Sequence, residues 1–196
     1  IMGRFDAVCL RAGEKVALHP SGMSYAVLQA HSLHYAEVLV RLGVETGARV
    51  GLRAVMSDAH VVGLLSILRA GGTYVPLDPY VAHRAGCRLV LSAPALAGAD
   101  GLQVIPLEVG SQSESWEGGP WQADPADTAC VLYTSGSTGQ PKGVPIRAEA
   151  ILTRLSWWAR TYPMDEGDCF LSQLSTHTLG GTIAPLSALL QGGGVH

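Results

Sequence analysis

The most informative segment of the chain reads Tyr133-Thr134-Ser135-Gly136-Ser137-Thr138-Gly139-Gln140-Pro141-Lys142-Gly143. It follows a strongly apolar run that predicts a buried strand, and a second short strand is expected directly after it. Its glycines permit positive φ and let the backbone approach a ligand closely. Hydroxyls, backbone amides and one lysine converge there, as a bound polyphosphate requires. Composition alone leaves a hydrophilic hairpin without a ligand as an equal alternative.

Strands and helices alternate on both sides of this segment. Strands are expected over 15–18, 49–54, 73–77, 88–91, 103–107, 128–133, 143–146 and 169–174. Helices are expected over 24–42, from a Ser57 cap to 70, and over 148–160 and 181–191. This order predicts an α/β fold with a parallel or mixed sheet and helices on both faces. Residues 110–127, rich in Ser, Gly, Glu and Pro, are expected to form a surface linker within it.

Composition excludes several classes of function. The 196 residues are 47% hydrophobic and 15% charged, with a net charge of −3 and no basic cluster. Binding to nucleic acid or to an anionic membrane is therefore not expected. The four cysteines form no CxxC pair, and neither a signal peptide nor an apolar run of about 18 residues is present, so a cytoplasmic protein is expected. The first residues, Ile1-Met2, and a glycine-rich end at 192–196 indicate a piece of something longer.

The eleven-residue segment resembles the phosphate-binding signature of the adenylate-forming enzymes. That superfamily includes acyl- and aryl-CoA ligases, luciferases and the adenylation domains of nonribosomal peptide synthetases. Two further segments are similar to its earlier motifs, in the same order: Met23-Ser24-Tyr25-Ala26-Val27-Leu28, and Ile67-Leu68-Arg69-Ala70-Gly71-Gly72-Thr73-Tyr74-Val75-Pro76-Leu77-Asp78-Pro79. The resemblance implies that residues 1–196 form the N-terminal portion of the large subdomain of an adenylation (AMP-binding) domain.

A two-step reaction is implied by this resemblance. The family uses ATP and Mg²⁺ to convert a carboxylic acid into an acyl-adenylate, which a thiol then captures. The acceptor is a carrier-protein phosphopantetheine or coenzyme A, so other synthetase domains are expected partners. By residue match, the phosphate cradle would consist of Thr134, Ser135, Gly136, Ser137, Thr138, Gly139 and Lys142. No protein-bound metal site is expected within this chain.

The sequence departs from the peptide-synthetase pattern near its end. Those domains usually carry an Asp that pairs with the α-amino group of the substrate, but residues 174–181 contain no acid. A buried ammonium without a counter-ion is costly, so an ordinary α-amino acid is a doubtful substrate. His177 and Gly180 instead resemble the His-x-x-Gly of acyl- and aryl-acid-activating relatives, which makes them candidates for the acyl pocket. A histidine at a helix entry, bonded to backbone, is an equal alternative for His177.

Two more departures from the family pattern count against full activity. The segment between Pro79 and Arg88 is shorter than in the family, and Ala148 stands where relatives place a helix-capping His or Asn. The family's remaining motifs lie beyond residue 196, so these residues alone are expected to be inactive. The main hypothesis is therefore part of an adenylating enzyme. The alternative is a truncated, non-catalytic adenylation-like module that serves as a scaffold or docking domain in a megasynthase.

Overall fold

A six-stranded sheet is the larger of two sheets in the computed structural model, which describes residues 1–77, 85–94, 101–110, 127–134 and 141–196. Its order is β6-β5-β3-β4-β7-β8. The strands are β3 (Arg49–Arg53), β4 (Thr73–Pro76), β5 (Leu89–Ser92), β6 (Gln103–Pro106), β7 (Thr128–Thr134) and β8 (Lys142–Arg147). Neighbouring strands are parallel except β8, which is antiparallel to β7. The sheet is therefore mixed, as one of the two expectations had it.

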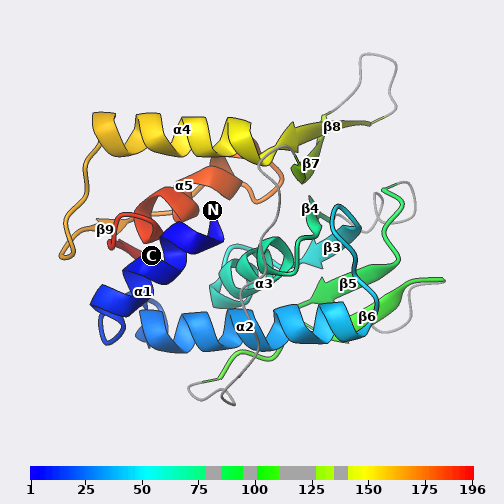
Figure 1. Ribbon diagram of the computed structural model, residues 1–196, viewed down its shortest axis with the longest axis horizontal. Helices are drawn as coiled ribbons and strands as arrows, with labels where there is room; N and C mark the ends of the chain where they lie inside the picture. Colours follow the sequence, from blue (N-terminus) through cyan, green and yellow to red (C-terminus); the bar gives the residue numbers. More distant parts are fainter. Residues whose placement is uncertain (78–84, 95–100, 111–126, 135–140) are drawn as a thin grey trace.

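A smaller sheet lies at the opposite end of the molecule, at the left of Figure 1. Its order is β2-β1-β10-β9, with β1 (Val16–Leu18), β2 (Met23–Ser24), β9 (Cys169–Phe170) and β10 (Gly194–Val195). The expectation of a strand over 169–174 is wrong in length. Only two residue pairs join β9 to β10, and the contact ends with one further backbone hydrogen bond, from the Ser172 N–H to the His196 carbonyl oxygen.

The helices α2 (Tyr25–Arg41) and α3 (Asp58–Arg69) start and stop where local chemistry requires. The hydroxyls of Ser24 and Ser57 accept hydrogen bonds from backbone N–H groups in the first turn of each helix, as N-caps do. Gly43 follows α2 with φ +85°, the left-handed conformation that ends many helices. The Ser57 cap expected from the sequence is confirmed, and α2 covers nearly all of the range expected for it.

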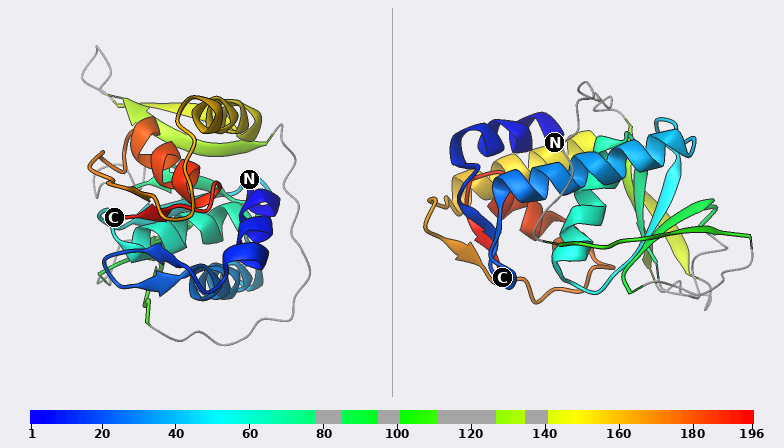
Figure 2. Two further views of the ribbon diagram at one scale, coloured as in Figure 1. Left: turned by 90° about the vertical axis from the view of Figure 1, so that its left-hand side faces the viewer. Right: turned by 90° about the horizontal axis from the view of Figure 1, so that it is seen from below.

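Three helices differ from expectation or refine it. Helix α1 (Met2–Ala12) was not expected, although its buried residues repeat at helical spacing: Met2, Phe5, Val8, Cys9 and Ala12. Helix α4 (Ala148–Thr161) starts without a side-chain cap, as Ala148 indicated. Helix α5 (Leu179–Leu189) begins two residues earlier than expected, because the Thr178 hydroxyl caps it. Two views in Figure 2 show the helices between the two sheets.

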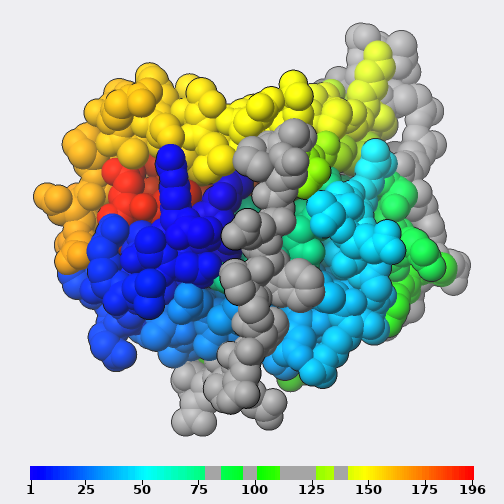
Figure 3. Space-filling view, in the orientation of Figure 1, coloured from blue at the N-terminus to red at the C-terminus, as the bar shows by residue number. Residues whose placement is uncertain are grey.

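The main hydrophobic core joins all five helices to one face of the six-stranded sheet. On the opposite face a smaller cluster gathers Val75, Leu77, Ala85, Cys87, Val90 and Val131. No helix of the described residues contributes to that smaller cluster, so the expected helices on both faces are seen here on one. Figure 3 shows α5 recessed between α4 and α1, which accounts for its nearly complete burial.

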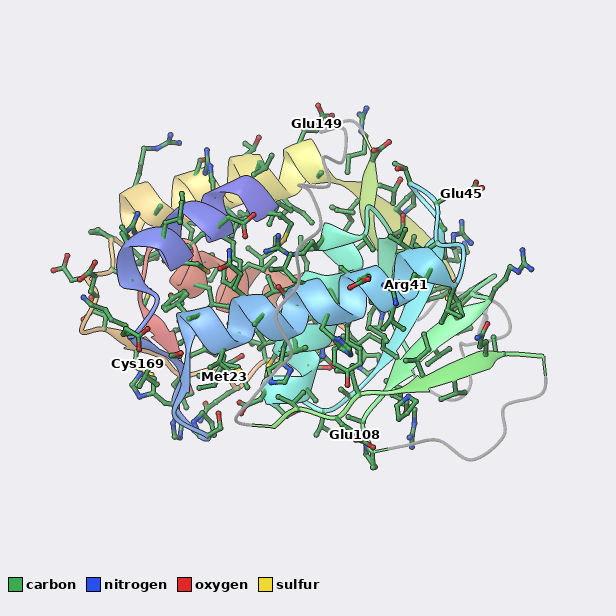
Figure 4. The ribbon with its side chains drawn as sticks, turned by 60° about the horizontal axis from the view of Figure 1, so that its bottom comes forward. Met23, Arg41, Glu45, Glu108, Glu149 and Cys169 are labelled. Atoms are coloured by element: carbon green, nitrogen blue, oxygen red, sulfur yellow. The ribbon has the colours of Figure 1, made fainter. Side chains whose placement is uncertain are left out.

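Three of the four cysteines are buried, and the fourth, Cys169, is exposed at the edge of the molecule (Figure 4). Of the helices in the described ranges, none combines the length and the apolar character that crossing a membrane demands. Residues 111–126, which make up nearly all of the expected linker, lie outside the described residues.

A buried polar junction ties the first three helices together at the C-terminal end of α3. The Arg69 guanidinium, only 5% exposed, donates to both carboxylate oxygens of Asp6, at 2.5 and 3.2 Å. It also donates to the Ser32 hydroxyl, while the Gln29 side chain donates to Asp6. We call Asp6, Gln29, Ser32 and Arg69 the Arg69 junction. The arginine binds the carboxylate in the bidentate geometry that gives the strongest such pairs.

Candidate functional site

Strands β7 and β8 form an antiparallel hairpin that brings the two ends of the glycine-rich segment together. Thr134 is paired with Lys142 in the register of the two strands, and the Thr134 hydroxyl lies 3.5 Å from the Lys142 carbonyl oxygen. Both residues are exposed. Residues 135–140 lie outside the described residues, and with them the predicted site residues Ser135, Gly136, Ser137, Thr138 and Gly139. The hairpin thus places one hydroxyl and one ammonium group at the mouth of this segment.

Gly143, near the start of β8, leaves little room for a side chain. A Cβ on Gly143 would lie 3.1 Å from both Tyr133 Cζ and Val131 Cγ1. The Tyr133 ring therefore packs against the bare backbone of Gly143 on the neighbouring strand. Glycine in a strand often marks such a close approach, and here it maintains the pairing next to Lys142.

His177 belongs to a tight turn, not to a helix. The Thr178 N–H donates to the Ser175 carbonyl at 3.0 Å, and the His177 N–H donates to the Ser175 hydroxyl at 3.3 Å. Thr178 then caps α5 through a hydrogen bond from the Gly181 N–H to its hydroxyl. The imidazole of His177 is exposed, with Nδ1 lying 3.4 Å from the Thr176 hydroxyl. We call residues 175–178 the His177 turn.

The two glycines at the start of α5 have different roles. A Cβ on Gly181 would overlap the backbone carbonyl of Ser175, which cannot move without displacing the His177 turn. A Cβ on Gly180 would meet only the Leu174 side chain, 2.9 Å from Cδ1. Gly180, the residue that sequence reasoning selected, is therefore less constrained than Gly181, which it missed. The adjacent Gly-Gly pair was the available signal.

The His177 turn rests on a buried tyrosine of β4. The hydroxyl of Tyr74, whose side chain is 0% exposed, donates to the Thr176 carbonyl oxygen at 3.2 Å. The Tyr74 ring also meets the ring of His60 edge-on, with centroids 6.0 Å apart. His60 lies in the first turn of α3 and is 1% exposed. We call His60, Tyr74, Thr176 and His177 the His60 cluster.

Burial sets the protonation states in this cluster. Desolvation lowers the pKa of His60 to about 4; the backbone of Ala54 opposes this change, and His177 adds to it. Burial also raises the pKa of Tyr74 far above its ordinary value, so its hydroxyl remains a donor. Neither ring nitrogen of His60 has a partner among the described residues within ordinary hydrogen-bond distance and angle, although the ring lies close enough to the Ala54 backbone for that backbone to act on its pKa. A neutral imidazole with one donor and one acceptor is thus buried without full satisfaction.

The structure brings some predicted site residues together and separates others. Thr134 and Lys142 are neighbours across the hairpin, and His177 lies close to Gly180 across the cap of α5. The two groups are connected through adjacent strands, because Tyr74 of β4 is paired with Cys130 of β7. Thr134 lies four residues further along β7, which corresponds to roughly 13 Å.

Mg²⁺ in proteins is held by several oxygen ligands, which carboxylates commonly supply. Within the described ranges, no group of three or more His, Cys, Asp or Glu side chains is placed to hold a metal ion. The described residues therefore do not fit a protein-bound metal. Hydroxyl and ammonium groups at the hairpin instead suit the oxygen atoms of a phosphate.

The family model described as AMP-binding enzyme matches residues 5–196, nearly the whole chain. The chain belongs to this family of adenylate-forming enzymes. The match starts within α1 and continues through both sheets to β10. It includes the β7–β8 hairpin and the His177 turn, so both groups of candidate site residues lie in the matched region.

Several relatives are named as synthases or synthetases. AMB antimetabolite synthetase AmbB of Pseudomonas aeruginosa is 35% identical over 212 residues, covering 98% of this chain and 16% of AmbB. Surfactin synthase subunit 2 of Bacillus subtilis is 34% identical over 197 residues, covering 94% of this chain and 6% of that subunit. Zwittermicin A synthase ZmaJ of Bacillus cereus is 31% identical over 183 residues, covering 86% of this chain and 35% of ZmaJ. This chain therefore spans from about a sixteenth to about a third of their lengths.

Solved structures confirm the fold. The nonribosomal peptide synthetase FmoA3 matches with a TM-score of 0.85 at 24% identity, over 98% of this chain and 22% of that one. The N-terminal subdomain of Klebsiella oxytoca NpsA, in complex with 3-hydroxybenzoyl-AMSN, matches with a TM-score of 0.81 at 24% identity. That match covers 100% of this chain and 52% of the NpsA chain. The layered α/β architecture predicted from the sequence is thus that of adenylation-domain N-terminal subdomains.

Proposed function

We propose that this chain supplies the phosphate-binding end and part of the acid-binding end of a site that activates a carboxylic acid with ATP. A carboxylate oxygen attacks the α-phosphorus and forms a new P–O bond. The bond from that phosphorus to the oxygen bridging to the β-phosphate breaks, and pyrophosphate leaves with both electrons. A thiol then attacks the acyl carbon of the acyl-adenylate, and AMP departs. The thiol belongs to a carrier-protein phosphopantetheine or to coenzyme A.

The observation that carries this proposal is the pairing of Thr134 with Lys142 at the hairpin mouth. In our proposal the Lys142 ammonium neutralises charge that develops on the departing β- and γ-phosphates. The Thr134 hydroxyl donates to a phosphate oxygen, and Ser135, Gly136, Ser137, Thr138 and Gly139 complete the cradle. Fixed donors of this kind stabilise a transition state because they need no reorganisation during the reaction. Mg²⁺ bound to ATP would share the same charge.

At the acid end, we assign His177 and Gly180 to the acyl pocket. Residues 174–181 contain no carboxylate that could pair with an α-ammonium group. Acids without that group, such as aryl or alkyl acids, are therefore favoured as substrates. The exposed Leu174 and Leu179 side chains offer apolar surface beside the exposed imidazole of His177, and the segment carries no charged carboxylate.

The wider setting is also part of the proposal. The names of the relatives support a multidomain synthetase in which a carrier protein receives the acyl group. A cytoplasmic setting agrees with four cysteines that are all unpaired, three of them buried.

The chain offers a matched test, because Lys142 and Lys15 are its two lysines. Lys15 lies next to β1 in the small sheet and forms an ion pair with Glu166 on the surface. In the full-length protein, we expect Lys142→Ala to reduce acid-dependent ATP–pyrophosphate exchange by about 100-fold or more. Lys15→Ala should leave the exchange rate within about twofold, since exposed ion pairs contribute little.

Equal exchange rates in the two variants would contradict the proposed role of Lys142. Retained product formation by Lys142→Ala would instead favour the non-catalytic scaffold. Thermal unfolding of both variants serves as the control, because both side chains are exposed and neither substitution should lower Tm appreciably.

A further inference from the structure

Tyr74 belongs to the motif that resembles an adenylation-domain fold marker, and the function proposed above gives it no role. Its ring is part of the main core, which a structural role would explain. Its hydroxyl, however, reaches across 102 residues of sequence to the Thr176 carbonyl. That carbonyl belongs to the residue directly before His177. A core tyrosine thus makes a hydrogen bond to the backbone of the His177 turn.

The surroundings of Tyr74 leave its hydroxyl little freedom. His60 packs edge-on against the ring, at an interplanar angle of 81°. Thr176, the acceptor, is itself buried, whereas His177 next to it is exposed. The hydrogen bond therefore connects the packed interior to an exposed turn, and the Thr176 hydroxyl continues the connection to His177 Nδ1 at 3.4 Å.

His60 provides an independent sign that this region is not only structural. A buried imidazole that lacks good hydrogen bonds costs free energy that a methionine or leucine would avoid. Native proteins keep few such groups, and those that remain often lie at functional sites. Here the unsatisfied ring lies directly behind Tyr74, on the side of the sheet that carries the His177 turn.

We propose that Tyr74 is a positioning residue for acid recognition: its hydroxyl, braced by the His60 ring, holds the His177 turn in the geometry that binds the carboxylic acid. This inference rests on the proposed function, because it assigns the His177 turn to the acid end of the site. Tyr74 does not touch the substrate in this account. It acts through the Thr176 carbonyl and the backbone that carries the His177 imidazole.

Tyr25 offers a matched control for Tyr74. It is also 0% exposed, and its hydroxyl also donates to backbone carbonyls near α5, at 2.6 Å to Gly193 and 3.1 Å to Leu189. Leu189 is the last residue of α5 and Gly193 follows the helix, so both acceptors lie at the end of α5 that is far from the His177 turn. Tyr25→Phe and Tyr74→Phe therefore each remove one buried tyrosine hydroxyl. The hydroxyl of Tyr25 binds the backbone near the C-terminal end of α5, and that of Tyr74 binds the backbone near its N-terminal end.

The experiment measures ATP–pyrophosphate exchange by the full-length protein, with KM determined separately for the acid and for ATP. The acid is whichever of benzoate, salicylate, butanoate, octanoate and the proteinogenic amino acids supports the fastest wild-type exchange. We expect Tyr74→Phe to raise KM for the acid about five- to tenfold, as the loss of one hydrogen bond predicts, with KM for ATP within twofold. Tyr25→Phe should change neither KM, even where it lowers Tm.

Thr176→Val is a second variant that preserves the shape of the side chain and removes the hydroxyl facing His177. It should raise KM for the acid in the same direction as Tyr74→Phe, which keeps the test informative if either variant folds poorly. Unchanged KM for the acid in both variants, or an equal rise in Tyr25→Phe, would overturn the inference. Absence of exchange by the wild-type protein with every acid would contradict the proposed function instead, so the two failures can be told apart.

Discussion

The two ends of α3 carry buried polar groups in contrasting surroundings. At the C-terminal end, the Arg69 guanidinium binds both oxygens of Asp6 and the Ser32 hydroxyl. At the N-terminal end, the His60 imidazole is more deeply buried and finds no good partner among the described residues. Satisfied polar groups hold a fold together, and Arg69 indeed joins α1, α2 and α3. An unsatisfied group costs stability, so its retention indicates a role outside packing.

The largest expected effect comes from removing the carboxylate partner of Arg69 at the C-terminal end of α3. Asp6→Ala would leave the Arg69 charge buried without its partner, so we expect a loss of about 3 kcal/mol in the free energy of unfolding. Asp6 is itself 33% exposed, which keeps this value at the lower limit for buried pairs. Denaturant unfolding of the variant measures it.

The ion pair between Glu37 and Arg41 on the surface of α2 is the control for this change (Figure 4 labels Arg41). Glu37→Ala should cost no more than about 0.5 kcal/mol, because exposed i,i+4 pairs contribute little. Similar losses for Asp6→Ala and Glu37→Ala would show that the Arg69 junction does not stabilise the fold.

The buried His60 imidazole, at the N-terminal end of α3, should make the free energy of unfolding depend on pH. The pKa of His60 is about 4 in the folded chain and near 6.5 in the unfolded chain, so the unfolded state binds more protons between these values. Stability is then fully present above pH 6.5 and falls as the pH is lowered toward 4, by up to about 3 kcal/mol. Unfolding measured from pH 7.5 to 4 tests the direction and the window.

His60→Met isolates this contribution, since a thioether does not titrate and methionine fits irregular core sites. We expect the variant to lose less stability than the wild type over the same pH range, and to be at least as stable at pH 7. Parallel pH profiles for the two proteins would show that His60 is not the group responsible.

A smaller effect is expected where the His177 turn meets α5. Gly181→Ala places a methyl group against the Ser175 carbonyl, and we expect a loss of about 2 kcal/mol together with a higher KM for the acid. Gly180→Ala is the neighbouring control and should lose less than about 1 kcal/mol, because only the flexible Leu174 side chain must move. Thermal unfolding and exchange kinetics on both variants would show the difference, and the reverse order would contradict the turn geometry.

Much of the fold could be predicted because local signals coincide with tertiary structure. Ser57 caps α3 in the structure as the sequence indicated, and Gly43 adopts the left-handed conformation after α2. The strands of the large sheet were also expected close to their observed bounds, and β4 and β5 are the clearest case, since strands buried on both faces have mostly apolar residues. Helix α1 shows the same kind of periodic signal, and it was overlooked.

The candidate site was only partly accessible to sequence reasoning. The segment 133–143 identified Thr134 and Lys142 because its glycines, hydroxyls and lysine are contiguous. The support of the His177 turn is not contiguous: Tyr74 lies 102 residues from Thr176. His60, on yet another element, resembles any polar residue in the first turn of a helix. No pattern within a single stretch could reveal this cluster, which only the pairing of β4 with β7 and the position of α5 bring together.

Acid-dependent ATP–pyrophosphate exchange by the full-length wild-type protein tests the central claim most directly. The account predicts exchange that requires one of the panel acids and that prefers an acid without an α-amino group. Exchange that proceeds equally well without any acid, or none with every acid tested, would contradict it.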